Sequence, residues 1–163
     1  MHQKFRVVNY ICIRMSTLLI PEFYENGFLF STDNKRLQLA SIHRFLSEES
    51  YWAKRIPFET VQQSVENSLC IGIYEENGQQ AGFGRMITDQ ATFAYLADIF
   101  IVKMHRGKGL SKIMMRMFCE AAEHFGLRRF ILTTQDAHSL YAQFGFVPFP
   151  WPERMMSRPG RQY

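Results

Sequence analysis

Residues 98–112 have the sequence Asp-Ile-Phe-Ile-Val-Lys-Met-His-Arg-Gly-Lys-Gly-Leu-Ser-Lys. The apolar run that ends at Val102 predicts a buried strand, and a helical pattern begins at Leu110. The basic turn between them contains Gly107 and Gly109, which can adopt backbone angles closed to other residues. The first amides of a helix have no internal acceptor, and the helix dipole adds positive charge there. The stretch therefore predicts a strand, a turn and a helix that together bind a phosphate or pyrophosphate.

Basic side chains around the turn favour the same ligand: Lys103, Arg106, Lys108 and Lys112. Two other glycine-rich phosphate sites are excluded by their spacing. A P-loop needs four residues between its glycines, but one residue separates Gly107 from Gly109. The dinucleotide-binding fingerprint needs a third glycine where this chain has Lys112. A glycine turn that precedes a helix and binds no ligand remains the alternative.

The turn resembles the acetyl-CoA loop of the GNAT superfamily of acyl-CoA-dependent N-acyltransferases, whose pattern is Gln/Arg-x-x-Gly-x-Gly/Ala. Gly107 and Gly109 match its glycines, and Arg106 stands where the family often has an arginine. Met104 replaces the usual Gln or Arg, which removes one side-chain contact to phosphate but leaves the main-chain cradle.

A second motif lies downstream, at residues 137–146, Ala-His-Ser-Leu-Tyr-Ala-Gln-Phe-Gly-Phe. It is similar to the family's pattern Ala-x-x-Leu-Tyr-x-x-x-Gly-Phe, a short helix followed by a glycine turn into a strand. Thr134 replaces an asparagine that is often found before this tyrosine, so one polar contact to the cofactor arm is not carried over. Together the two motifs cover the C-terminal half of the chain in the family's order.

The resemblance implies an α/β (α+β) fold with a mixed, mostly antiparallel central sheet, splayed at the CoA site, and flanking helices. It implies an N-acetyltransferase that moves an acetyl group from acetyl-CoA to an amine by direct attack, with no covalent enzyme intermediate and no metal. The residues expected to bind the cofactor are Phe100, Ile101, Val102, Arg106, Gly107, Lys108, Gly109, Leu110, Ser111 and Tyr141.

Two side chains are the catalytic candidates. Tyr141 matches the family's tyrosine, and a phenol with a pKa of about 10 is protonated at neutral pH, so we expect it to protonate the departing thiolate. Asp98 lies in an otherwise apolar strand, where a carboxylate needs a partner or a task, so we expect it to act as general base. The alternatives are a core aromatic at Tyr141, a structural carboxylate bonded to backbone or Arg at Asp98, and His138 or water as the base.

We expect the amine to enter beside Asp98. The resemblance implies that the segment with Glu48-Glu49 and Tyr51-Trp52 borders the acceptor pocket of this fold. Aromatic rings with nearby acids suit an aliphatic amine or a peptide N-terminus, and they suit plain loop packing equally well. We therefore expect a small-molecule or peptide amine as partner. The net charge of +4 is explained by the phosphate loop and a basic C-terminus, so we expect no nucleic-acid partner.

The cysteines predict the compartment. Cys12, Cys70 and Cys119 are an odd number at wide spacings, which suits free thiols in a reducing cytoplasm better than disulfides or a zinc site. No apolar run reaches the length of a membrane helix, and charges interrupt residues 1–20 as they would not in a secretory signal. A monomer and a homodimer both fit these features.

The pattern of elements predicts one N-acetyltransferase domain over 27–163, after an extension of uncertain order over 1–26, with translation starting at Met1 or Met15. Strands are predicted over 28–32, 69–74, 81–88, 93–102, 130–134 and 146–149, and helices over 37–49, 58–67, 110–125 and 137–144. Two other functions stay open: a catalytically silent CoA-binding or sensing module, and an acyltransferase that acts on an aminoacyl-tRNA or protein amine.

Overall fold

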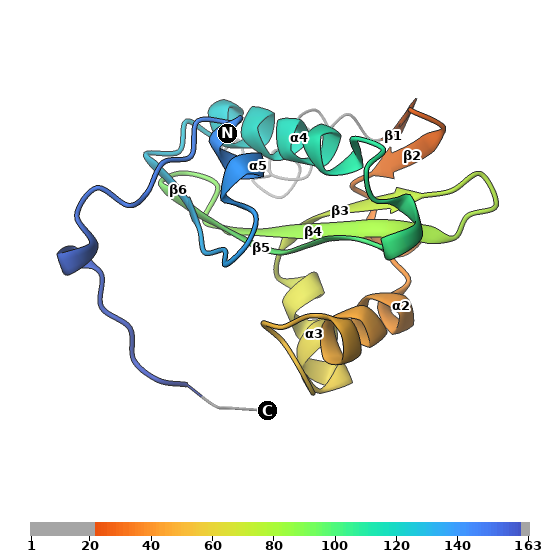
Figure 1. The fold of residues 1–163 in the computed structure, drawn as a ribbon, viewed down its shortest axis with the longest axis horizontal. Helices are drawn as coiled ribbons and strands as arrows, with labels where there is room; N and C mark the ends of the chain where they lie inside the picture. The colour runs from red at the N-terminus through yellow and green to blue at the C-terminus, as the bar shows by residue number, and fades with distance from the viewer. Residues whose placement is uncertain (1–21, 161–163) are drawn as a thin grey trace, which may run out of the picture.

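The computed structural model describes residues 22–160, which form a six-stranded sheet with helices on both faces (Figure 1). The strands follow chain order across the sheet; neighbours from β1 to β5 are antiparallel, and β5 and β6 are parallel. The mixed, mostly antiparallel sheet with flanking helices is therefore confirmed. The strands are β1 (Glu22–Glu25), β2 (Phe28–Ser31), β3 (Leu69–Tyr74), β4 (Gln80–Thr88), β5 (Phe93–Ile101) and β6 (Arg129–Leu132). The helices are α2 (Leu39–Arg44), α3 (Phe58–Glu66), α4 (Leu110–His124) and α5 (His138–Ala142), with shorter turns η1 (Asn34–Arg36), η2 (Phe45–Glu49), η3 (Lys103–His105) and η4 (Pro152–Arg154).

Apolar cores fill both faces of the sheet. Helices α4 and α5 cover one face, where the fully buried Met114 and Phe118 pack with side chains of the strands (Figure 1). Helices α2 and α3 cover the other face, where Phe45 stacks on Phe100 of β5 with ring centroids 3.8 Å apart. None of the helices described for residues 22–160 is both long and apolar enough to cross a membrane.

Three segments differ from their sequence-based prediction. The helix predicted over 37–49 is divided, because its second half (η2) forms a π-helical turn. Residues 22–25, within the stretch whose order the sequence left open, pair with β2. The strand predicted over 146–149 is wrong: these residues form no ladder with any described strand, and Pro148 has no N–H to donate to one.

Strands β5 and β6 separate soon after they begin. They pair over only four residues each, from Phe93 opposite Arg129 to Leu96 opposite Leu132. Beyond Leu96, β5 continues to Ile101 with β4 on one side and no described strand on the other. The main-chain groups on that side are left for another partner, because buried backbone donors and acceptors must be satisfied.

A β-bulge lies where the two strands separate. Asp98 and Ile99 together face the single residue Gly84 of β4, and Asp98 has a left-handed backbone with φ of 55°. The extra residue shifts the alternation of side chains by one. Leu96 lies in the core under α4, and after the bulge Ile99 and Ile101 contact that core again. Without the bulge, Asp98 would face the α4 core in place of Ile99.

The bulge depends on Gly84. A Cβ atom there would lie 2.4 Å from Cδ1 of Ile99, 2.8 Å from Sδ of Met114 and 3.0 Å from Cε2 of Phe118. We predict that Gly84→Ala lowers the free energy of unfolding by about 1–3 kcal/mol through overpacking, measured by urea denaturation. The control is Gly160→Ala, where a Cβ meets nothing within 4 Å. Equal stability of both variants would show that the core relaxes around the added methyl.

Candidate active site

The glycine turn has the backbone that its sequence predicts. Gly107 and Gly109 both have φ of 78°, in the left-handed region that favours glycine. Gly109 is the N-cap of α4, and no side chain caps the helix there. The first amide of α4 that donates to a backbone carbonyl is that of Lys112, to Gly109 O at 3.0 Å. The amides of Leu110 and Ser111 have no acceptor among residues 22–160, which is the arrangement that binds a phosphate.

A polar network braces the turn from behind. The buried His105 contacts Oε1 of Glu75 through Nε2 at 2.9 Å and Nζ of Lys108 through Nδ1 at 3.1 Å. Because an ammonium group can only donate, Nδ1 accepts and Nε2 carries the proton that is donated to Glu75. Asn26, in the β1–β2 turn, donates to Lys108 O at 3.3 Å, and the ring of Phe28 lies 5.2 Å from the Lys108 ammonium. Contacts within the protein thus fix both the ammonium group and the backbone carbonyl of Lys108.

The end of β5 has one paired and one open edge. The Val102 amide donates to Ala81 O of the preceding strand at 2.9 Å, so the main chain of Phe100 and Val102 faces β4. Ile101 alternates with them and directs its carbonyl to the open side, where Arg106 Nε donates to it at 3.0 Å. Of Phe100, Ile101 and Val102, the strand residues expected to bind the cofactor, Ile101 alone therefore directs its main chain to the open side.

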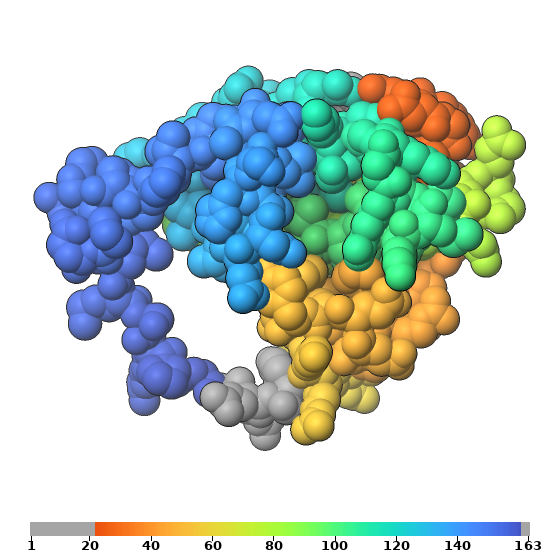
Figure 2. Space-filling model, viewed as in Figure 1, coloured from red at the N-terminus to blue at the C-terminus, as the bar shows by residue number. Residues whose placement is uncertain are grey.

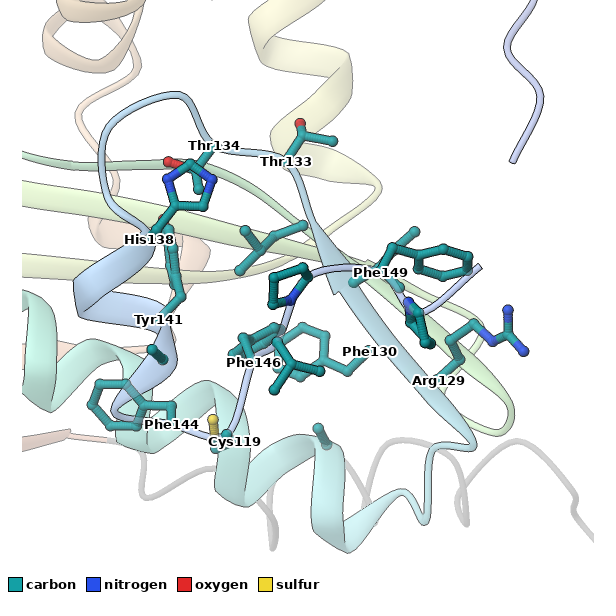
Figure 3. A pocket seen from close by; sticks show the side chains of 18 of the residues that line it. Cys119, Arg129, Phe130, Thr133, Thr134, His138, Tyr141, Phe144, Phe146 and Phe149 are labelled. Carbon is teal, nitrogen blue, oxygen red and sulfur yellow. The ribbon is translucent and has the colours of Figure 1, made fainter. Parts of the chain in front are cut away.

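Two cavities flank this region. One of about 760 Å³ lies between β6, α5 and the segment 144–151, and Figure 3 shows Thr134, His138 and Tyr141 at one end of it and Arg129 and Phe149 at the other. The second, of about 390 Å³, lies under α2 and is lined by Phe100, Val102, Lys103 and Met104. Met104, which stands where the family usually has a polar side chain, is 75% exposed.

Tyr141 lies on α5 with its ring mostly buried, edge-on to Phe146 at 6.0 Å between centroids. Burial raises the pKa of Tyr141 to about 12, and the nearby charges of Tyr51, Asp136 and Tyr95 add to the rise. The phenol is therefore protonated at neutral pH. Tyr141 packs in the core under α4 and also lines the larger cavity. A ligand in that cavity can therefore contact the Tyr141 side chain.

Asp98 has two partners. Its Oδ2 accepts from Arg85 Nε at 2.6 Å and its Oδ1 accepts from Trp52 Nε1 at 3.0 Å. The side chains of Arg85 and Asp98 are only 15% and 9% exposed, so solvent screens this ion pair weakly. Sequence reasoning missed Arg85, although a lone cation within the apolar strand predicted over 81–88 marks it.

The remaining candidates lie nearby. His138 is exposed at the start of α5 and lines the larger cavity. Cys119 of α4 also lines it, and burial, followed by the charges of Glu123 and Glu120, raises the pKa of its thiol to about 11. The thiol is therefore neutral and a weak nucleophile. Within residues 22–160, no three His, Cys, Asp or Glu side chains are placed to hold a metal ion.

The chain matches known proteins over this whole region. The model of the acetyltransferase (GNAT) family matches residues 39–146. A Gibberella zeae protein, FG08082, named as a candidate acetyltransferase, is 32% identical over 149 residues, which cover 79% of this chain and 84% of that protein. A crystal structure of a GNAT-family candidate acetyltransferase from Xanthomonas campestris is 46% identical, with a TM-score of 0.78 over 82% of this chain and 93% of that one.

More distant structures share the fold alone. One is a candidate acetyltransferase from Deinococcus radiodurans, 18% identical, with a TM-score of 0.64 over 83% of this chain and 92% of that one. The matched family region contains the glycine turn, the bulge at Asp98 and the motif around Tyr141. The chain therefore belongs to the GNAT family of acetyltransferases.

Proposed function

We propose that this protein is an N-acetyltransferase that moves an acetyl group from acetyl-CoA to an amine by direct attack. The observation that carries the proposal is the open edge of β5, which lies between the uncapped glycine turn and the protonated phenol of Tyr141. The free thiols of Cys70 and Cys119 favour the cytoplasm as the place of the reaction.

The residues present fit the diphosphate of CoA. A Cβ at Gly107 would enter open space, and the amides of Leu110 and Ser111 lie at the positive end of a helix of 15 residues. Arg106 and Lys108 add positive charge at the same turn. When bound, acetyl-CoA supplies the activated thioester. The amide of Ile101, which faces the open side, would donate to its pantetheine arm as to a neighbouring strand, while the Ile101 carbonyl accepts from Arg106 Nε.

Tyr141 acts as general acid in this proposal. With a pKa of about 12, the phenol keeps its proton at neutral pH and donates it to the departing thiolate. Asp98 takes the proton of the attacking amine, directly or through water. Its bonds to Arg85 and Trp52 fix the direction of the carboxylate at the bulge.

A CoA-binding module without turnover is the second candidate. The contacts of Asp98 favour it, because Arg85 and Trp52 already bond both carboxylate oxygens, which is the arrangement of a structural carboxylate. Release of free thiol from acetyl-CoA, measured over a panel of amines, separates the two functions.

The first prediction concerns the cofactor. CoA at a hundredfold excess over its Kd should stabilise the wild type by about 2.7 kcal/mol, seen as a rise in Tm by calorimetry. Gly109→Glu should abolish the rise, because a carboxylate would occupy the phosphate site. The matched control is Gly126→Glu, at the other end of α4, with a similar left-handed backbone (φ of 63°). Equal protection of both variants would place CoA elsewhere.

The second prediction concerns the acid. Tyr141→Phe should lower kcat roughly 10- to 1,000-fold, with much less change in the KM for acetyl-CoA. Tyr24→Phe, which removes a hydroxyl from a ring that is 69% exposed on β1, should leave both constants unchanged. If chemistry limits the rate and Tyr141→Phe keeps the wild-type kcat, the side chain serves packing alone.

The third prediction concerns the base. Asp98→Asn keeps the size of the side chain and tolerates the left-handed backbone, but it cannot take up a proton. It should lower kcat/KM most at neutral pH, with partial recovery at high pH, where more of the amine is already neutral. A pH–rate curve that is merely scaled down, together with a lower Tm, would instead make Asp98 an anchor of the bulge.

A further inference from the structure

The loop between η2 and α3 is held firmly at its base. Ser50 is buried, donates to Leu46 O at 2.6 Å and accepts from the amide of Ala53 at 3.1 Å. The two residues that follow Ser50 are Tyr51 and Trp52, whose rings contact edge to face with centroids 4.9 Å apart. The loop therefore presents a fixed pair of aromatic rings.

This aromatic pair bridges the gap between β5 and β6. On the β5 side, Trp52 Nε1 donates to Asp98 at the bulge, at 3.0 Å. On the β6 side, the Tyr51 hydroxyl donates to Asp136 at 3.3 Å and accepts from the Gln135 amide at 3.2 Å. In the space-filling view, the yellow-orange surface of this region lies against the blue surface that follows β6 (Figure 2). The two rings therefore join the bulge of β5 to the residues that lead into α5, the helix that carries Tyr141.

The bridge offers free ring surface and one uncompensated charge. Although both side chains are hydrogen-bonded, Tyr51 is 47% and Trp52 is 44% exposed. Arg85 balances the charge of Asp98, whereas Asp136 forms no ion pair within residues 22–160, even though Lys54 and Arg55 follow in the same loop. An aromatic face beside an unbalanced carboxylate attracts an alkylammonium group and repels an anion.

We propose that the acceptor is an alkylamine that carries a second positive charge, as a diamine does. The proposal rests on the proposed function. The second ammonium group lies between Asp136 and the rings of Tyr51 and Trp52, while the first amine, in its neutral form, attacks the thioester.

The atoms of this transfer balance. A bond forms between nitrogen and the carbonyl carbon as the bond between that carbon and sulfur breaks. The proton of the amine leaves to Asp98 or water, and the thiolate takes the proton of Tyr141, which is restored from solvent. The second ammonium group takes no part in the chemistry, so it selects the substrate without changing the reaction.

Three amines of equal chain length test the selection: butane-1,4-diamine, butylamine and 4-aminobutanoate. Asp136→Asn should lower kcat/KM for the diamine about 2- to 5-fold, and for butylamine less than 2-fold, as expected of an exposed charge pair. Trp52→Leu should likewise penalise the diamine more than butylamine. Comparing each variant with the wild type cancels the different basicities of the amines. The control is Glu59→Gln on α3, an exposed carboxylate away from the bridge.

Each outcome bears on the proposal. A selective loss for the diamine, with an unchanged KM for acetyl-CoA and with 4-aminobutanoate as the poorest acceptor, supports it. Equal losses for the diamine and butylamine would overturn it, because Asp136 and Trp52 would then only hold the loop. Efficient acetylation of 4-aminobutanoate would overturn it as well. If CoA protects the wild type but no amine is acetylated, the proposed function itself fails, and the inference fails with it.

Discussion

The requirement that backbone polar groups find partners governs the candidate active site. Strand β5 is paired on both sides only as far as Leu96, and from there its second edge is open. The bulge at Asp98 lies at this point and returns Ile99 and Ile101 to the core under α4. Gly84 makes room for that bulge. The open edge, the core beneath it and the carboxylate beside it are thus consequences of one interruption in strand pairing.

The glycine turn shows how a flexible sequence becomes a fixed structure. Glycines cost conformational entropy when they are ordered, so a turn with two of them needs support from elsewhere. Residues from three distant segments supply that support. Glu75 bonds the His105 ring, Asn26 donates to the Lys108 carbonyl, and the Phe28 ring packs against both His105 and the Lys108 ammonium. All three contact side chains or carbonyls of the turn, which leaves the amides at the start of α4 free to bind a ligand.

Local features were predictable from the sequence, and distant pairings were not. The turn, α4 and the position of Tyr141 follow from short motifs and from helical periodicity, which need no knowledge of tertiary contacts. The partners of Asp98 and Asp136 do not, because Trp52 lies 46 residues from the first and Tyr51 lies 85 residues from the second. The bulge was equally hidden, since only the register with β4 reveals it. The strand predicted over 146–149 had the right apolar residues, but Pro148 deprives it of a donor.

The prolines after α5 have a further effect on how this protein behaves among other copies of itself. The outermost strand of an open sheet is a template on which another chain can add, and long unprotected edges lead to aggregation. Pro148 and Pro150 lie beside β6, where both line the larger cavity, and neither has a backbone N–H group. A strand from another copy that approached the chain here would find no donor at either position. This stretch beside β6 is therefore a poor template for strand addition.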